Sequence, residues 1–139
     1  MIVLDTNVLS ELMRPAPAGS VMSWMAAQPA TSLYTTSITQ AEILHGILLL
    51  APGRRRTAFE AAAGAMFSKD FSGRIIAFGS DAAIHYARIA TARHRTGRPI
   101  SHFDAQIAAI ARSAGAAIAT RNVADYEDCG VKVINPWKV

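Results

Sequence analysis

Short apolar runs alternate with longer stretches of helical periodicity along the whole chain. Strands are predicted where β-branched and apolar residues cluster between turn residues, at 2–4, 32–36, 74–78, 116–120 and 131–134. Helices are predicted where apolar residues recur at helical spacing, at 18–28, 38–50, 54–69, 80–97 and 103–114, with a first helical pattern directly after the strand at 2–4. Because strand and helix alternate throughout, we expect one α/β domain over residues 1–139, in which a central, mostly parallel sheet of four to five strands carries helices on both faces.

Polar residues and glycine mark the ends of several of these helices. Ser37 with Gln40 three residues later forms a capping-box pattern, and Ser80 and Ser101 are placed to cap the two later helices. Gly115 is expected just after the last of them, where a left-handed backbone is common. The helix after Ser37 is apolar along almost its whole length, so we expect it to be deeply buried.

The composition is that of a folded globular protein, with 139 residues of which 51% are apolar and 17% charged. The single cysteine, Cys129, excludes an internal disulfide framework and is typical of a reducing cytoplasm, which is the expected location. The acid at Asp5, with no basic segment before it, argues against a signal peptide. The longest apolar tract, 43–51, is interrupted by His45 and is too short to span a bilayer, so no membrane association is expected.

The charge balance indicates an anionic partner. The formal net charge is +4, and eleven of the fourteen basic residues are arginines. Guanidinium groups bind phosphate through two parallel hydrogen bonds, whereas ammonium groups act as point charges. Nucleic acid is therefore the leading class of partner, with a generally basic surface as the alternative explanation.

Asp5 stands at the end of the first predicted strand and is the residue around which a site is predicted. The run from Ile2 to Leu4 contains no polar residue, which favours a strand buried on both faces of a parallel sheet. Ligands bind beyond the carboxyl ends of such strands, so Asp5 lies where chemistry is expected. The alternative is that Asp5 caps the helix whose pattern begins with Val8 and Leu9.

Other polar residues repeat this placement, each with a structural alternative. Glu42 is the only charged residue of an apolar helix, and burying a lone carboxylate is costly unless it is paired or binds a metal. Glu42 therefore serves a site, or else it pairs with an arginine or points along a solvent groove. Asp104 follows Ser101 by three residues, where the helix dipole alone would favour an acid. Asn122 and Asp125 follow the fourth predicted strand.

These positions would converge at one edge of the sheet. Carboxylates that converge without a basic residue repel one another and either take up protons or recruit a cation. Hard oxygen ligands select Mg²⁺ or Mn²⁺ over zinc. A carboxylate-bound divalent ion beside arginines is typical of phosphodiester cleavage, in which the metal activates water and stabilises the leaving oxygen.

Four motifs in order resemble a known family. They are LDTNV around Asp5, TQAEILHG around Glu42, SHFDAQIAAIA around Asp104, and the run ATRNVADYEDCGVKVINPW. Together they resemble a PIN-domain ribonuclease, and more narrowly the VapC-type (FitB-like) toxins of bacterial toxin–antitoxin pairs. The resemblance covers essentially the whole chain and implies a single PIN-like domain that cleaves RNA as the toxin of such a pair.

The resemblance also assigns roles to residues and partners. It implies that Asp5, Glu42 and Asp104 hold Mg²⁺ or Mn²⁺ as the cofactor, with Asn122 near the same cluster. Many members of the family carry an acid at that fourth position, so Asn122 is a departure that bears on whether a second metal binds, and Asp125 could supply the missing charge. The family further implies an RNA substrate, a homodimer and a small cognate antitoxin that covers the active site.

Hydroxyl and basic residues complete the predicted site. Thr6 and Thr120 match small hydroxyl residues of the family motifs and are expected to orient ligands or water, while Asn7 is expected to fix the turn. Four arginines are candidates for binding RNA phosphates, namely Arg93, Arg95, Arg98 and Arg121. For the first two, compensation of the helix dipole is an equal alternative.

Two rival functions remain at this point. One is a catalytically weak PIN domain that mainly binds RNA or a protein partner, suggested by Asn122. The other is a phosphatase-like α/β protein with Asp5 as nucleophile, although that chemistry commonly uses a second acid two residues later and Asn7 occupies that place. Metal-dependent cleavage of RNA distinguishes the nuclease from both.

Overall fold

The computed structural model describes all residues from 1 to 139, and its centre is a five-stranded parallel sheet. The strands are β1 (Ile2–Leu4), β2 (Leu33–Thr36), β3 (Ile75–Ile76), β4 (Ala117–Ala119) and β5 (Val133–Ile134). They lie in the order β3-β2-β1-β4-β5, and each neighbouring pair is parallel. The predicted α/β class and the strand number are confirmed, and β1 lies in the middle with Ile2 beside both Leu33 and Ala117.

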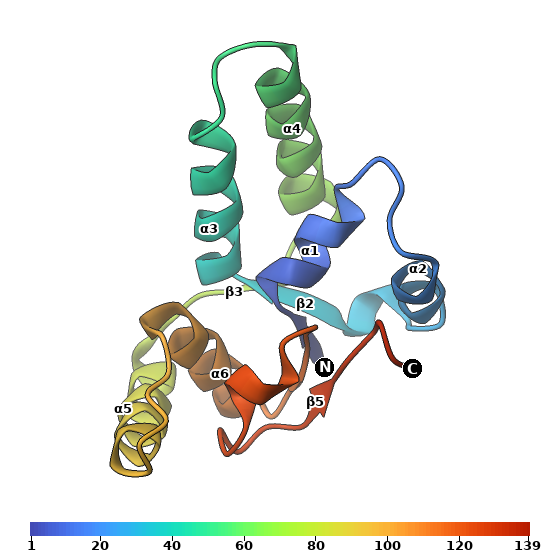
Figure 1. Cartoon of the computed structure of the whole chain (residues 1–139). Helices are drawn as coiled ribbons and strands as arrows, with labels where there is room; N and C mark the ends of the chain where they lie inside the picture. Colours follow the sequence, from blue (N-terminus) through green and yellow to red (C-terminus); the bar gives the residue numbers. More distant parts are fainter.

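Six α-helices connect and cover these strands (Figure 1). They are α1 (Thr6–Leu12), α2 (Gly19–Ala26), α3 (Ser37–Leu48), α4 (Arg54–Ala65), α5 (Ser80–Arg95) and α6 (His102–Ala114). Three short helical turns complete the chain: η1 (Ala30–Ser32), the π-helical η2 (Met66–Asp70) that continues α4, and η3 (Val123–Tyr126). No helix is both long enough and apolar enough to cross a membrane.

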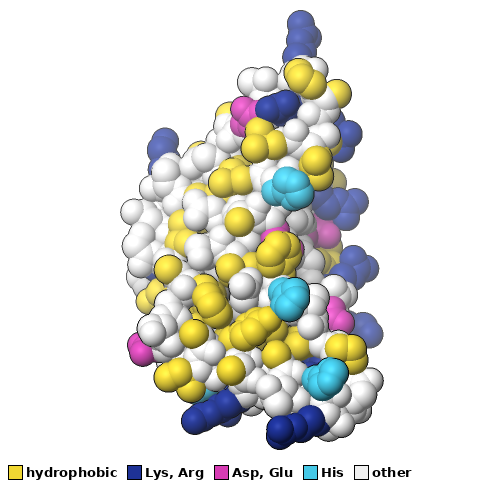
Figure 2. Space-filling view, turned by 90° about the vertical axis from the view of Figure 1, so that its left-hand side faces the viewer, with side chains coloured by type: hydrophobic (Ala, Val, Ile, Leu, Met, Phe, Trp, Pro, Cys, Tyr) yellow, Lys and Arg dark blue, Asp and Glu magenta, His cyan; other side chains and the backbone are white.

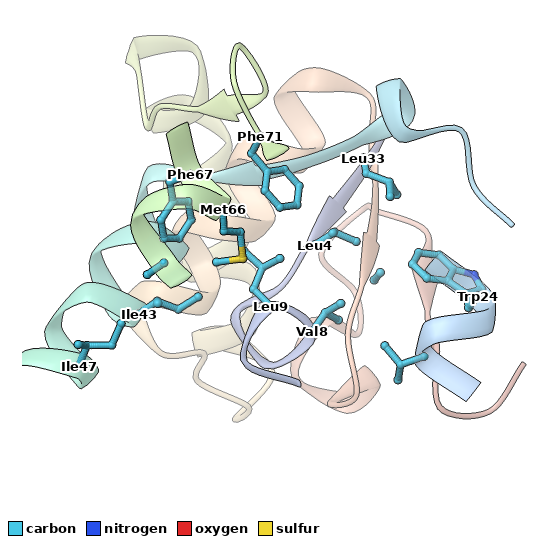
Figure 3. Packing of buried hydrophobic residues seen from close by; sticks show 13 residues of the cluster. Leu4, Val8, Leu9, Trp24, Leu33, Ile43, Ile47, Met66, Phe67 and Phe71 are labelled. Carbon is cyan, nitrogen blue, oxygen red and sulfur yellow. The ribbon is translucent and has the colours of Figure 1, made fainter. Parts of the chain in front are cut away.

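The two faces of the sheet bury separate hydrophobic clusters because successive side chains of a strand point in opposite directions. Leu4 packs with residues of α1, α2, α3 and α4, and Figure 3 shows this cluster with Trp24 at one end and Ile47 at the other. Val3 packs on the opposite face with residues of α5, α6 and β4. This double burial explains why the first strand contains no polar residue.

Two predicted helix caps, Ser37 and Ser80, are wrong, and both predicted caps of α6 are confirmed. The N-cap of α3 is Thr36, whose hydroxyl accepts a hydrogen bond from the backbone N–H of Thr39 at 3.1 Å, so Ser37 lies inside the helix. The reason is that Thr36 ends β2 with an extended backbone and the chain turns into α3 without a loop. Ser80 is likewise the first residue of α5 and not its cap. The caps of α6 are as predicted, with Ser101 before it and a left-handed glycine after it.

The prediction that α3 is deeply buried is wrong. Ile43 and Ile47 face the core, but Leu44, Leu48 and Leu49 are 40%, 58% and 73% exposed. Figure 1 gives the reason, because α3 and α4 project together beyond the sheet and leave one side of α3 without a neighbour. Hydrophobic side chains consequently gather on this face of the molecule, as Figure 2 shows.

The cap assignment predicts different effects for two neighbouring substitutions. Thr36→Val keeps the shape of a fully buried side chain but removes the acceptor for the Thr39 N–H, so it should lower the free energy of unfolding by about 1 kcal/mol. Ser37→Ala should change it by less than about 0.5 kcal/mol. Urea denaturation followed by circular dichroism measures both, and the reverse order of effects would show that Ser37 is the cap.

Candidate active site

Asp5 is held at the carboxyl end of β1 by both backbone and side-chain contacts. Its backbone N–H donates to the carbonyl of Ala119 in β4 at 2.9 Å, so the two strand ends lie together. One carboxylate oxygen, Oδ1, accepts from the backbone N–H of Thr6 at 2.8 Å and caps α1. The other, Oδ2, accepts from the hydroxyl of Thr120 at 2.8 Å. Asp5 therefore caps a helix and also turns its second oxygen toward the end of β4.

Thr120 and Asn7 organise the turns around this carboxylate. Thr120 is fully buried, and its hydroxyl accepts from the Asn7 side-chain amide at 3.0 Å while it donates to Asp5. The Asn7 carbonyl oxygen accepts in turn from the backbone N–H of Arg121 at 3.2 Å. These contacts tie the segment after β1 to the segment after β4. They are consistent with the orienting role predicted for Thr120 and with the turn-fixing role predicted for Asn7.

Glu42 reaches the same region from α3. Its Oε1 accepts a hydrogen bond from the Thr6 hydroxyl at 2.8 Å, and that hydroxyl is 3.0 Å from the hydroxyl of Thr39. Glu42 forms no ion pair with an arginine, so the arginine pairing considered from the sequence does not hold. Thr6 thus connects the first turn of α1 to the carboxylate of α3.

Asp104 completes the acids from α6. Its backbone N–H donates to the Ser101 hydroxyl at 3.2 Å, which confirms the capping pair, while its carboxylate Oδ1 accepts from the hydroxyl of Tyr126 at 3.3 Å. Tyr126 is 1% exposed and was missed in the sequence. Its presence in the run after β4 was a usable signal, because a buried tyrosine hydroxyl needs a hydrogen-bond partner.

The predicted acids and amides line one cavity of about 550 Å³. It contains Asp5, Glu42, Asp104, Asn122, Asp125, Thr6 and Arg121 among its lining residues. Arg14, Glu11 and Trp137 line it as well and were not predicted. Arg14 pairs with the buried Glu11 at 3.2 Å, and the guanidinium carbon of Arg121 lies 5.3 Å from the centre of the Trp137 ring. The sequence pattern thus located the cavity and missed part of its rim.

Burial and mutual repulsion act on the acids of this cavity, and the two arginines that line it, Arg14 and Arg121, form no ion pair with Asp5, Glu42 or Asp104. Burial is the main cause that raises the pKa of Asp5, and the charge of Asp104 adds to it, while hydrogen bonds from Thr120 and Thr6 act in the opposite direction. Burial also raises the pKa of Glu42, again with contributions from the charges of Asp5 and Asp104. None of the three acids takes part in an ion pair.

The donor set fits a hard divalent cation, although the acids do not form a closed site. No three His, Cys, Asp or Glu side chains are grouped closely enough to be a ready-made metal centre. Three carboxylates in one cavity, none of them paired with a basic residue, are nevertheless the kind of ligands that Mg²⁺ and Mn²⁺ prefer.

Three of the four arginines predicted to bind RNA lie outside the cavity. Arg93 is 6% exposed and donates to the carbonyls of Asp125 and Glu127, so the prediction that it binds RNA is wrong: its guanidinium is occupied inside the protein. Arg98 forms surface ion pairs with Glu127 and Asp128. Arg95 is exposed at the end of α5, and its role stays a prediction.

Comparison with known proteins places the chain and its fold in a family. A family model described as PIN domain matches residues 2–124. VapC ribonuclease Y4jK of Sinorhizobium fredii is 38% identical over 138 residues, and toxin FitB of Neisseria gonorrhoeae is 34% identical over 137 residues, each match covering 99% of both chains. The crystal structure of FitAcB from Neisseria gonorrhoeae matches with a TM-score of 0.93 over 100% of both chains, at 34% identity.

The fold and the cavity together define an α/β domain with a carboxylate cluster beyond the carboxyl ends of a parallel sheet. The chain belongs to the PIN-domain family, in which its full-length relatives include a VapC ribonuclease and the toxin FitB. The resemblance stated from the sequence is thereby confirmed. VapBC-1 from nontypeable Haemophilus influenzae, with a TM-score of 0.83 at 23% identity, shares the fold.

The raised pKa values predict how stability depends on pH. A carboxyl whose pKa is higher in the folded than in the unfolded protein binds more protons when folded, so stability falls as pH rises from the usual carboxyl range through the folded pKa. In metal-free protein, Asp5→Asn should therefore raise the free energy of unfolding at pH 7.5, and this gain should shrink as the pH falls toward 4. Urea denaturation at a series of pH values measures it, and a gain that grows at low pH would contradict the assignment.

Proposed function

We propose that the chain is an endoribonuclease dependent on Mg²⁺ or Mn²⁺ and the toxin of a toxin–antitoxin pair. The observation that carries the proposal is the meeting of Asp5, Glu42 and Asp104 in one cavity without a basic partner. Two full-length relatives, one named a VapC ribonuclease and one named a toxin, support the cleavage of RNA as the reaction. The arginines and the net charge of +4 suit an RNA substrate.

In this proposal the three carboxylates hold the divalent ion. When bound, such an ion makes water a better nucleophile and neutralises charge on the phosphate and the leaving oxygen. Thr120 and Thr6 hold Asp5 and Glu42 in place by the hydrogen bonds they donate. Arg121, stacked over Trp137 at the cavity, is suited to bind a phosphate of the RNA.

Asn122 and Asp125 occupy the fourth corner of the cavity. Asn122 offers a neutral carbonyl oxygen where many relatives in the family carry an acid, while Asp125 adds a carboxylate one helical turn later in η3. At this corner the chain therefore offers a neutral oxygen from Asn122 and, close to it, the negative charge of Asp125. We infer that the first ion is held firmly and that any second ion depends on Asp125.

Cleavage of RNA tests the proposal. Purified protein free of antitoxin should cut single-stranded RNA in the presence of Mn²⁺ or Mg²⁺ and stop when EDTA is added. Asp5→Asn should lower the rate by at least about 100-fold, since losing outer partners of metal ligands already costs roughly 10- to 100-fold. Asp70→Asn removes an exposed carboxylate outside this cavity and serves as the matched control.

The same assay separates the alternatives. Binding of RNA by wild-type protein with no cleavage at any metal concentration would support a PIN domain that only binds RNA or a protein. Hydrolysis of phosphate monoesters without RNA cleavage would instead support the phosphatase-like reading. Either result would contradict the nuclease.

A groove beside the cavity is suited to the antitoxin. It measures about 270 Å³, and five of its ten lining residues are hydrophobic. These five come from α3, α4 and the chain just after α1 and α3, namely Met13, Ile43, Ile47, Leu50 and Phe59. Thr6, Ser10 and Glu42 line both the groove and the acidic cavity. Structures of relatives are described as FitAB and as VapBC. We propose that a cognate small antitoxin lies in this groove and thereby reaches the acids.

The exposed face of α3 is suited to a second copy of the chain. Leu48 and Leu49 lie there, and Ile84 of α5 and Phe103 of α6 are 57% and 54% exposed. Figure 2 shows that hydrophobic side chains are concentrated over this side of the molecule. Exposed hydrophobic side chains gathered on one side of a protein are typical of an interface. A homodimer through this face agrees with the expectation from the family resemblance.

The oligomeric state tests this face directly. Wild-type protein should have twice the 14.8 kDa mass of one chain in light scattering, and Leu48→Asp should reduce it to the monomer while the circular dichroism spectrum stays unchanged. Met22→Asp places the same charge on an exposed residue of α2 and should leave the dimer intact. A Leu48→Asp protein that remains dimeric would place the interface elsewhere.

A further inference from the structure

Arg93 is the only basic side chain among the buried residues, and it has no carboxylate partner. Three backbone carbonyls accept its hydrogen bonds: Nε donates to Arg98 at 2.7 Å, and Nη1 donates to Asp125 at 2.9 Å and to Glu127 at 3.2 Å. Burying a guanidinium without an anion is costly, and only such a set of acceptors makes it tolerable. Arg93 thereby ties the segment before α6 to the segment on either side of Tyr126.

The carbonyls that Arg93 binds flank the tyrosine of the active site. Asp125 and Glu127 are the residues on either side of Tyr126, whose hydroxyl donates to the Asp104 carboxylate at 3.3 Å. Tyr126 is buried, and its phenol is kept protonated because burial and the nearby acids raise its pKa. Arg93 therefore fixes the backbone of η3 where it presents this donor to Asp104.

The same guanidinium also holds the segment that leads into α6. The carbonyl of Arg98 lies three residues before Ser101, the cap of the helix that carries Asp104. Figure 1 shows η3 beside α6 at the end of the sheet. Arg93 thus binds both the approach to the helix of Asp104 and the turn that supplies its hydrogen-bond donor. The ion pairs of Arg98 with Glu127 and Asp128 join the same two segments at the surface, where such pairs contribute little.

Asp104 needs a positioning partner because its neighbours repel it. The charges of Asp5 and Glu42 act on the same cavity, and the Tyr126 hydroxyl is the only side-chain donor to the Asp104 carboxylate. If the turn that carries Tyr126 shifts, the carboxylate loses the contact that directs it toward the other two acids. The three acids Asp5, Glu42 and Asp104 can therefore converge only while η3 keeps its position.

We propose that Arg93 is a positioning residue that sets Asp104 for metal binding through the backbone of η3 and the hydroxyl of Tyr126. The inference rests on the proposed metal-dependent function and deepens it. Arg93 does not line the cavity itself, and the carbonyls that it binds flank Tyr126, so its effect on Asp104 passes through the backbone of η3 and the Tyr126 hydroxyl. A purely structural Arg93 would stabilise the fold and leave the affinity for metal unchanged.

The test compares substitutions in full-length protein without antitoxin. Arg93→Met should weaken Mn²⁺ binding in isothermal titration roughly tenfold, which is the loss expected when a residue that holds a metal ligand in place is removed. The Mn²⁺ affinity of Arg93→Lys should lie between that of Arg93→Met and that of wild type. Tyr126→Phe should weaken Mn²⁺ binding by a similar factor. The double variant should bind no more weakly than the weaker single variant, because both changes break one chain of contacts. Arg54→Met removes an exposed arginine of α4 and should bind Mn²⁺ like wild type.

A second measurement needs no metal. The ¹³C resonance of Tyr126 Cζ reports the hydrogen bond of its hydroxyl, and it should move in Arg93→Met and stay in place in Arg54→Met. If Arg93→Met does not fold, Arg93→Lys takes its place, and the same comparison is made with Tyr126→Phe and the double variant of the two. An unchanged resonance, or Mn²⁺ affinities that weaken independently in the double variant, would overturn the inference. Absence of Mn²⁺ binding by wild-type protein would instead count against the proposed function, and the tyrosine resonance would still decide the role of Arg93.

Discussion

Repulsion among the carboxylates of Asp5, Glu42 and Asp104 is the constraint around which the active-site end of the molecule is arranged. Each acid is held by a hydrogen-bond donor from a different segment: the Thr120 hydroxyl for Asp5, the Thr6 hydroxyl for Glu42 and the Tyr126 hydroxyl for Asp104. These bonds offset part of the cost of placing acids in a partly buried cavity, and none of the three acids forms an ion pair that would offset the rest. The remaining charge is what suits the site to a divalent ion.

The parallel sheet is what brings these segments together. β1 lies between β2 and β4, so the residues that follow the three strands emerge at one edge. Because Thr36 both ends β2 and caps α3, the helix starts at that edge and carries Glu42 into the cavity. Its isoleucines face the core while Leu44 and Leu48 face outward. One helix therefore contributes to the core, to the acid cluster and to the surface proposed for a second copy.

The sequence was sufficient for the elements, the fold class and the residues of the acid cavity, because periodicity and strand-end acids are local signals. It was not sufficient where the partner of a side chain decides its role. The apolar pattern of α3 predicted burial, but periodicity cannot show that no neighbour covers Leu48 and Leu49. Arg93 looked like an exposed residue at a helix end, and only the folded chain brings the carbonyls of the η3 segment to it. Tyr126 was overlooked for the same reason, since its partner, Asp104, is 22 residues away in sequence.

The central claim is that the three carboxylates of this PIN domain share one divalent ion. Anomalous diffraction from crystals soaked in Mn²⁺ tests it most directly, because the ion is located without reference to activity. We predict a manganese peak in the cavity within bonding distance of oxygens of Asp5, Glu42 and Asp104. Well-diffracting, Mn²⁺-soaked crystals with no peak there, or with manganese bound only elsewhere on the surface, would contradict the claim.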